Sequence, residues 1–207
     1  MSSSVERSAE RLVFFSDAVV AIALTLLILP LADVVPEAAR EHARSLDVIT
    51  ENQWKIYSFL LSFAVIGRLW MSHHRLFEQI KAYNRPLMTV NMAWLLTIVV
   101  LPFPTEMIGG FDDDRFTAVF YIATILVSDL CMMAMVLITR RDPDVARNPG
   151  GVPDRRFFLG VFNVGLLVLA LALAALVPGV RYLALLPLLL NYPASWILRR
   201  RTAGATA

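Results

Sequence analysis

Long stretches without any charged residue are the feature that most limits what this chain can fold into. Residues 86–105, 157–180 and 182–198 contain no Asp, Glu, Lys or Arg. An α-helix needs about 20 predominantly apolar residues to cross a bilayer, and each stretch approaches or exceeds that length. The apolar residues run continuously instead of alternating, which is typical of membrane-spanning helices and not of barrel strands. We therefore expect an integral membrane protein built only of α-helices.

The hydropathy pattern predicts six transmembrane helices and one domain covering residues 1–207. The spans are expected at roughly 12–31, 54–79, 86–108, 116–139, 156–178 and 180–199. Pro178-Gly179 is expected to turn the chain between the last two spans. The longest connections, about 22 residues at 32–53 and about 16 at 140–155, leave no room for a soluble domain. The composition agrees, with 57% hydrophobic residues and a mean hydropathy of +0.63.

The distribution of Lys and Arg predicts that both termini face the cytoplasm. With the N-terminus inside, the inside segments carry 13 of the 19 basic residues and the outside segments carry five. The acidic run 112–114 would then face outward, where it either concentrates cations or is simply a solvated loop. A cleavable signal peptide is a competing interpretation of the N-terminus, but Glu6 and Glu10 offset Arg7 and Arg11.

An apolar stripe follows the charged N-terminal residues. Phe15, Ala18, Ile22, Thr25 and Leu29 are spaced 3, 4, 3 and 4 residues apart, so they share one face of a helix. A ring of Ile or Leu from several copies can close a pore by dewetting, and Thr25 would offer a weak hydroxyl ligand. Such a neck favours K⁺, which sheds water more easily than Na⁺. The alternative is that the stripe packs against a neighbouring helix.

Asp17 is expected to point away from this stripe, toward the other helices of the same subunit. A carboxylate inside a membrane protein needs an ionic or hydrogen-bonding partner. The candidate partners are Arg11, Trp70, His73, His74 and Asn91. We expect Ser16 and Asp17 to join one of the histidines and Asn91 in a network that fixes the helix. A helix-capping role for Ser16 and Asp17 is compatible with that network.

The other ionisable residues within the spans allow fewer conclusions. Adjacent His73 and His74 point about 100° apart on a helix and have no Cys-rich or H-E-x-x-H context, so no metal site is expected. A histidine could also sense pH. Asp129 lies in the middle of the fourth span, where an acid is a candidate functional residue, and Arg68 is its candidate partner across helices.

Three segments resemble one known family. Arg11, Phe15, Ser16 and Asp17 fit R-x-x-x-F-S-D, and the helix continues as Ala-Ile-Ala-Leu-Thr-Leu-Leu through residues 21–27. Residues 70–77, Trp-Met-Ser-His-His-Arg-Leu-Phe, and residues 101–105, Leu-Pro-Phe-Pro-Thr, extend the similarity. This combination resembles the transmembrane-protein-175-type potassium channels, an endolysosomal family with a bacterial branch. The resemblance is strong over roughly the first 110 residues, and beyond them only helix number, length and hydrophobicity agree.

The resemblance implies a six-helix subunit that assembles as a homotetramer around a pore lined by the first helix. Like the family, this sequence lacks the Thr-Val-Gly-Tyr-Gly filter of ordinary potassium channels. By motif position, the constriction would consist of Ile22 and Leu29 with Thr25 between them, and Leu26 is a possible further contact. The polar residues near the motif would support the pore helix: Arg11, Phe15, Ser16, Asp17, Trp70, His73, His74 and Asn91.

The leading hypothesis is therefore a potassium-permeable cation channel of the cell membrane with a hydrophobic gate and no cofactor. Its expected partners are other copies of the chain, membrane lipids and monovalent cations, and not nucleic acid. No enzymatic activity is expected, because no paired catalytic carboxylates, nucleophile triad or phosphate loop is present. A proton-coupled small-solute transporter using Asp17, His73 and Asp129 is the alternative, although inverted repeats and paired broken helices are not apparent. An accessory membrane subunit without transport is a third hypothesis.

Overall fold

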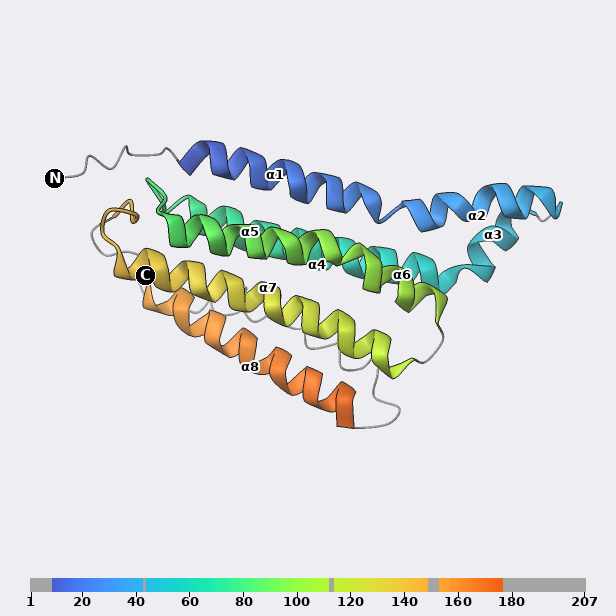
Figure 1. Cartoon of the computed structure of the whole chain (residues 1–207). Coiled ribbons are helices and arrows are strands. Elements are labelled where there is room, and N and C mark those ends of the chain that lie inside the picture. Colours follow the sequence, from blue (N-terminus) through green and yellow to red (C-terminus); the bar gives the residue numbers. More distant parts are fainter. Residues whose placement is uncertain (1–8, 43, 112–113, 149–152, 177–207) are drawn as a thin grey trace, which may run out of the picture.

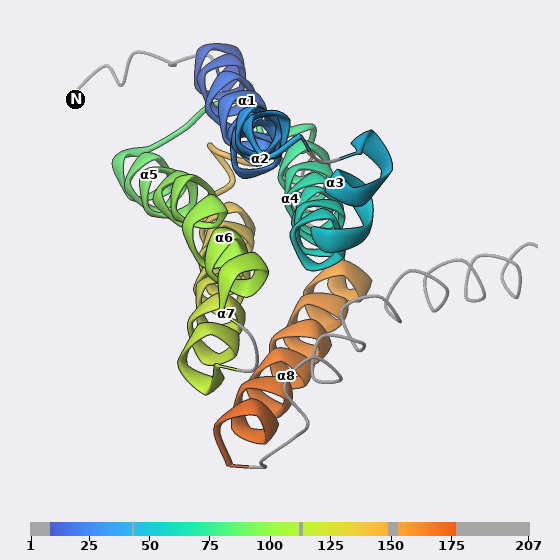
Figure 2. The ribbon, with the colours of Figure 1, turned by 90° about the vertical axis from the view of Figure 1, so that its right-hand side faces the viewer.

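The chain folds into a bundle of long helices that run side by side (Figure 1 and Figure 2). The computed structural model describes residues 9–42, 44–111, 114–148 and 153–176. These residues form eight helices, α1 (Ala9–Leu26), α2 (Leu29–Arg40), α3 (Ser45–Glu51), α4 (Gln53–Phe77), α5 (Arg85–Val100), α6 (Pro102–Gly110), α7 (Arg115–Arg141) and α8 (Asp154–Leu176). α1 and α8 lie on opposite sides of the bundle (Figure 2).

The first predicted span is interrupted. α1 ends at Leu26 and α2 begins at Leu29, and Leu27 and Ile28 form a turn between them. Pro30 explains the break, because it has no backbone N–H and its ring crowds the carbonyl four residues earlier. α2 then continues in roughly the direction of α1 (Figure 1). The expectation of a single helix over 12–31 is therefore wrong at its C-terminal end.

Residues 32–53 were expected to be a connection, but most of them are helical. α2 runs to Arg40, His42 adopts a positive φ of 57°, and α3 follows from Ser45 to Glu51. Histidine is one of the residues that tolerates this left-handed conformation, which reverses the chain between the two helices. α3 thereby returns the chain to the start of α4 (Figure 1).

The third predicted span is also divided. α5 ends at Val100 and α6 begins at Pro102, with Leu101 between them. Pro102 and Pro104 each remove one backbone donor, whereas the N–H of Thr105 still donates to the carbonyl of Leu101 at 3.2 Å. The result is a second discontinuity in the bundle.

Large buried side chains hold the helices together, with α7 packed against both α5 and α8, and α4 packed against α6. Trp94 from α5, Tyr121 from α7 and Ile66 from α4 are completely buried in this core. α8 is different, because most of its large apolar side chains, including Phe158 and Leu176, are exposed. In a membrane protein such a face suits contact with lipid.

Four helical units are long and apolar enough to cross a membrane: Ala9–Arg40, Arg85–Gly110, Arg115–Arg141 and Asp154–Leu176. The chain is thus a multi-pass membrane protein. α4, which carries Lys55, Arg68 and Arg75, is not among these units. Its 25 residues nevertheless extend about 37 Å at 1.5 Å per residue. The expected span 180–199 and the turn at 178–179 lie outside the described residues, so the six-span topology, its orientation and the single domain stay predictions.

Candidate functional site

α1 has two faces of opposite character. Its buried face consists of Ala9, Leu12, Ser16, Val20, Ala23 and, just beyond the helix, Leu27, spaced 3, 4, 4, 3 and 4 residues apart. The other face is apolar but points away from the bundle, with Ile22 59% exposed and Leu26 42% exposed. Phe15 and Ala18 are exposed on the same side. Each residue expected to line a pore on α1 therefore lies on the outside of the single subunit.

Thr25 is the polar member of this exposed face. Its hydroxyl donates to the carbonyl of Ile22 at 2.8 Å, three residues earlier in the helix. The hydroxyl hydrogen is therefore used within the helix, and the oxygen lone pairs are left to accept or to coordinate. This arrangement suits a weak oxygen ligand for a cation.

Leu29 lies beyond the break, as the first residue of α2, and is 50% exposed. The expectation that Ile22, Thr25 and Leu29 share one continuous helix is therefore wrong, because the turn at Leu27 and Ile28 separates Leu29 from the other two. All three still face away from the subunit's own core. The break makes the two expected rings, at Ile22 and at Leu29, parts of different helices.

A buried chain of hydrogen bonds ties α1 to α5 and α4. The Asn91 amide N–H donates to Ser16 Oγ at 3.0 Å, and Ser16 Oγ donates to the carbonyl of Leu12 at 2.8 Å. His73 Nε2 lies 2.8 Å from Asn91 Oδ1 and donates to it, which requires the tautomer with hydrogen on Nε2. Ser16, His73 and Asn91 are all fully buried. The sequence grouped these three residues, and the structure brings them together.

His73 is further held by aromatic rings. Its imidazole stacks on Trp94 with ring centroids 4.2 Å apart and on Phe77 with centroids 4.3 Å apart. These contacts leave the ring little freedom to rotate, so the hydrogen bond to Asn91 has a fixed direction. Sequence reasoning missed Trp94, although its position three residues after Asn91 places both on one side of α5.

Asp17 does not join that chain. Its carboxylate accepts a hydrogen bond from the Trp70 indole N–H at 2.8 Å. Arg11 is exposed and makes no ion pair with Asp17, and His74 lies beside Glu78 at 3.8 Å. Trp70 is thus the one of the five candidate partners that bonds to Asp17, and the expectation that Asp17 joins a histidine and Asn91 is wrong. Because the Trp70 indole is uncharged and exposed, removing Asp17 would leave neither an unpaired charge nor a buried donor.

A second polar centre connects α4, α7 and α8. Arg68 Nη2 donates to Asp129 Oδ2 at 3.3 Å, which confirms the pairing expected across helices. The Asn163 amide N–H also donates to the same carboxylate oxygen. Sequence reasoning missed Asn163, whose signal was its position as a polar residue within the uncharged stretch 157–180. The arrangement satisfies a carboxylate that would otherwise be costly inside the bundle.

Two more polar groups have structural contacts. Thr105 Oγ1 donates to Ser62 Oγ at 2.7 Å, and Ser62 Oγ lies 3.0 Å from Tyr121 Oη, which links α6, α4 and α7. Asp114 caps α7, accepting from the N–H and the hydroxyl of Thr117. These hydrogen bonds lower the pKa of the Asp114 carboxyl, the Thr117 hydroxyl contributing most. At least this residue of the acidic run 112–114 therefore has a capping function.

Fold and site together define a multi-pass helical membrane protein whose first helix is anchored by buried polar contacts and presents an apolar outer face. Comparison with known proteins shows which family part of this chain resembles. Residues 11–102 match the family model described as endosomal/lysosomal potassium channel TMEM175. Over this stretch, which is less than half of the chain, the protein is similar to the TMEM175 family, a family of ion channels and not of enzymes.

Relatives from bacteria and vertebrates match parts of the chain. A potassium channel of Streptomyces collinus is 37% identical over 125 residues, covering 59% of this chain and 57% of the relative. The endosomal/lysosomal proton channel TMEM175 of Danio rerio is 28% identical over 134 residues, covering 65% of this chain and 25% of the relative. This chain thus spans about half the length of the bacterial relative and a quarter of the vertebrate one.

One solved structure has the same fold. It is the crystal structure of a lysosomal potassium-selective channel TMEM175 homolog from Chamaesiphon minutus, which superposes with a TM-score of 0.69. The match covers 89% of this chain and 98% of that chain at 23% sequence identity. At this identity the likeness establishes the architecture of the subunit.

Proposed function

We propose that this protein is a potassium-permeable cation channel whose pore is formed between copies of the chain, with α1 of each copy facing the centre. One observation carries the proposal: the apolar face of α1 containing Ile22 and Leu26 points away from the subunit, while Ser16 on the same helix is locked into the core. Bacterial relatives bear the name potassium channel, which supports K⁺ as the permeant ion. A homotetramer follows the expectation from the family resemblance.

The proposed mechanism uses a hydrophobic constriction instead of a carbonyl filter. Rings of Ile22 and Leu29, with Leu26 as a further contact, exclude water from the closed pore, because hydrating a narrow apolar neck is unfavourable. A small widening admits a partly dehydrated cation. K⁺ passes more easily than Na⁺, since its hydration shell is easier to strip, and the Thr25 hydroxyl oxygen offers a transient ligand.

The buried polar contacts have a supporting role in this proposal. The Leu12–Ser16–Asn91–His73 chain fixes the rotation of α1 about its axis, because each bond requires one particular face of the helix to point inward. Asp17 and Trp70 add a second contact between α1 and α4. Arg11 and Phe15 make no contact of this kind in the described structure, so their assignment to the support rests on the motif alone. The His74 ring lies beside that of Trp70, with centroids 5.7 Å apart.

The alternative of a proton-coupled small-solute transporter draws support from one observation. Two discontinuous helical units, α1–α2 and α5–α6, are present, and broken helices are common at transporter binding sites. The residues expected to relay protons oppose it. Asp17 bonds to Trp70, His73 to Asn91 and Asp129 to Arg68, so no hydrogen-bond chain joins the three.

Ion flux from purified protein in liposomes separates these functions. We expect K⁺ efflux down a K⁺ gradient with no pH gradient imposed, and a faster efflux of K⁺ than of Na⁺ under matched conditions. Mass determination in detergent should give four copies per particle. Flux that requires a proton gradient would favour the transporter, and no flux above that of protein-free liposomes would favour an accessory subunit.

A further inference from the structure

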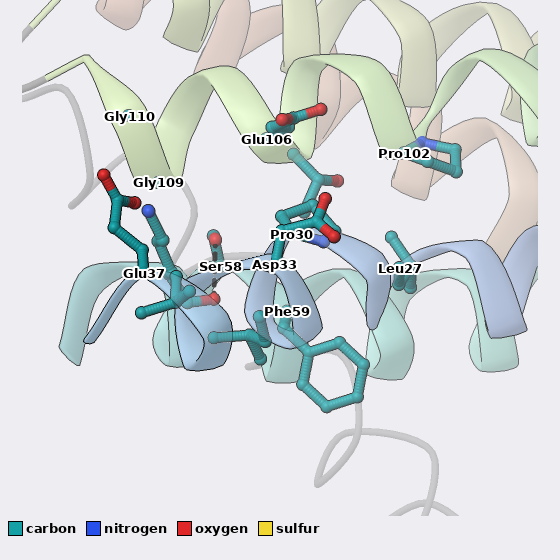
Figure 3. Close-up of a pocket in the computed structure, with 14 residues that line it drawn as sticks. Leu27, Pro30, Asp33, Glu37, Ser58, Phe59, Pro102, Glu106, Gly109 and Gly110 are labelled. Carbon is teal, nitrogen blue, oxygen red and sulfur yellow. Dashed lines mark hydrogen bonds between the residues drawn. The ribbon is translucent and has the colours of Figure 1, made fainter. Parts of the chain in front are cut away.

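A cavity of about 270 Å³ lies between α2, α4 and α6 (Figure 3). Asp33 and Glu37 extend from α2 toward α6, which carries Glu106 and Gly110 (Figure 3). Ser58 and Phe59 of α4 form another wall. The lining therefore combines apolar surface with several polar groups, as is usual for sites that bind small molecules.

The charges around this cavity are unbalanced. Asp33, Glu37 and Glu106 contribute three carboxylates, and Lys55 contributes the single ammonium group. None of the four forms an ion pair within 4.0 Å with another described residue. Unneutralised carboxylates around a concave surface attract cations and raise their local concentration. Ser58 Oγ, which donates its hydrogen to the carbonyl of Lys55, keeps its lone pairs to accept from a ligand.

The cavity lies directly behind the proposed constriction. Leu27 and Pro30, at the break between α1 and α2, line it, whereas Leu26 and Leu29 are exposed on the other side of the same turn. Pro102, at the break between α5 and α6, also lines it. Both helix discontinuities of the bundle therefore meet at one cavity. A ligand here would contact the segment that positions Leu29.

We propose that this cavity binds a small amphipathic amine, with its ammonium group toward the carboxylates and its apolar part against Leu27 and Phe59. The occupied cavity resists inward movement of the turn at Leu27 and Ile28, so binding alters opening of the constriction. The effect on opening rests on the proposed channel function. Binding of the amine to the cavity does not depend on the channel function, and binding and opening are measured separately.

The test uses n-hexylammonium as probe and 1-hexanol as its uncharged analogue. Gly110 lines the cavity and a Cβ built on it meets no atom within 4 Å, so Gly110→Leu extends a side chain into open space without a backbone clash. Gly165 in α8 has equally open surroundings but lies outside the cavity, which makes Gly165→Leu the matched control. Glu106→Gln removes one carboxylate and keeps its shape.

Binding is measured by calorimetry on purified protein in detergent. We expect hexylammonium to bind the wild type more tightly than hexanol, Gly110→Leu to weaken it about tenfold, and Gly165→Leu to leave it unchanged. Glu106→Gln should weaken it about two- to fivefold, the range for a solvent-accessible ion pair. Glu106→Gln also serves if Gly110→Leu does not fold.

Equal affinity in wild type, Gly110→Leu and Glu106→Gln would overturn the proposed site, as would equal binding of hexanol and hexylammonium. Flux in liposomes then tests the effect on opening, which we expect hexylammonium to change in wild type and in Gly165→Leu but not in Gly110→Leu. Binding that depends on Gly110 in a protein without K⁺ flux would uphold the site and reject the channel. K⁺ flux without such binding would uphold the channel and reject the site.

Discussion

Asn91 links two helices through one side-chain amide, and its replacement by alanine tests how α1 is held. The amide accepts from His73 Nε2 at 2.8 Å and donates to Ser16 Oγ at 3.0 Å, and all three residues are fully buried. Asn91→Ala removes both bonds together. Ser16 keeps its own bond to the carbonyl of Leu12 and loses only an incoming donor.

The cost of Asn91→Ala follows from the groups left behind. The Nε2–H of His73 becomes a buried donor without an acceptor, which costs about 1–3 kcal/mol. The rings of Trp94 and Phe77 stack on the imidazole and prevent it from turning to find another acceptor. The void left by the amide adds to the cost, as large-to-small core substitutions do. We expect a total loss of about 2–4 kcal/mol in the free energy of unfolding.

The assay is SDS titration of the purified protein in mixed micelles, followed by far-UV circular dichroism. Thr89→Ala is the matched control, because Thr89 is on the same helix, is exposed and bonds only to the carbonyl of Arg85. It should change stability by no more than about 0.5 kcal/mol. If Asn91→Ala costs no more than Thr89→Ala, the buried chain does not hold α1 and the reasoning is refuted.

Three other predictions concern the pore, the second polar centre and the topology. Ile22→Asn should raise the K⁺ leak through the closed channel in liposomes and reduce the channel's preference for K⁺ over Na⁺. Leu24→Asn, which lies off the exposed stripe, should have a smaller effect. Equal effects of the two substitutions would place the pore face elsewhere on α1. Asp129→Ala should lower stability in the same SDS titration by up to about 3–5 kcal/mol, since it leaves a guanidinium unpaired, and a neutral result would mean that water replaces the carboxylate. In a cysteine-free background, Phe116→Cys should react with an impermeant thiol reagent only from outside, and Arg147→Cys only from inside. Reaction of both positions from the same side of the membrane would contradict the predicted topology.

The periodicity of residues within one helix was the most reliable guide to which side chains face the core. The spacing of Asp17 relative to Ile22 predicted that Asp17 faces the subunit's other helices, and in the structure Asp17 bonds to Trp70 of α4 while Ile22 is exposed. Isolated polar residues in apolar helices also marked Asn91, His73 and the Arg68–Asp129 pair, because such groups need partners where water is absent. These inferences depend only on local spacing and on the cost of burying polar atoms.

Contacts between distant segments were less accessible. Asp17 has several possible partners within reach of α1, and the choice of Trp70 depends on how α4 is rotated, which the spacing within α1 does not determine. Pro30 causes the break near Leu27, but the apolar sequence continues across the break, so the hydropathy pattern does not reveal it. α2 was missed because Asp33 and Glu37 end the apolar run, although a helix tolerates charged residues on its exposed side.

Accessibility of position 22 to a charged thiol reagent during K⁺ flux tests the central claim most directly. In a Cys131→Ala background, Ile22→Cys would place a thiol on the exposed face of α1, and Leu24→Cys would serve as the control on the same helix. We expect a cationic methanethiosulfonate reagent to block most K⁺ flux through Ile22→Cys and to affect Leu24→Cys far less. Unchanged flux through Ile22→Cys, with its modification verified by mass spectrometry, would contradict a pore lined by this face.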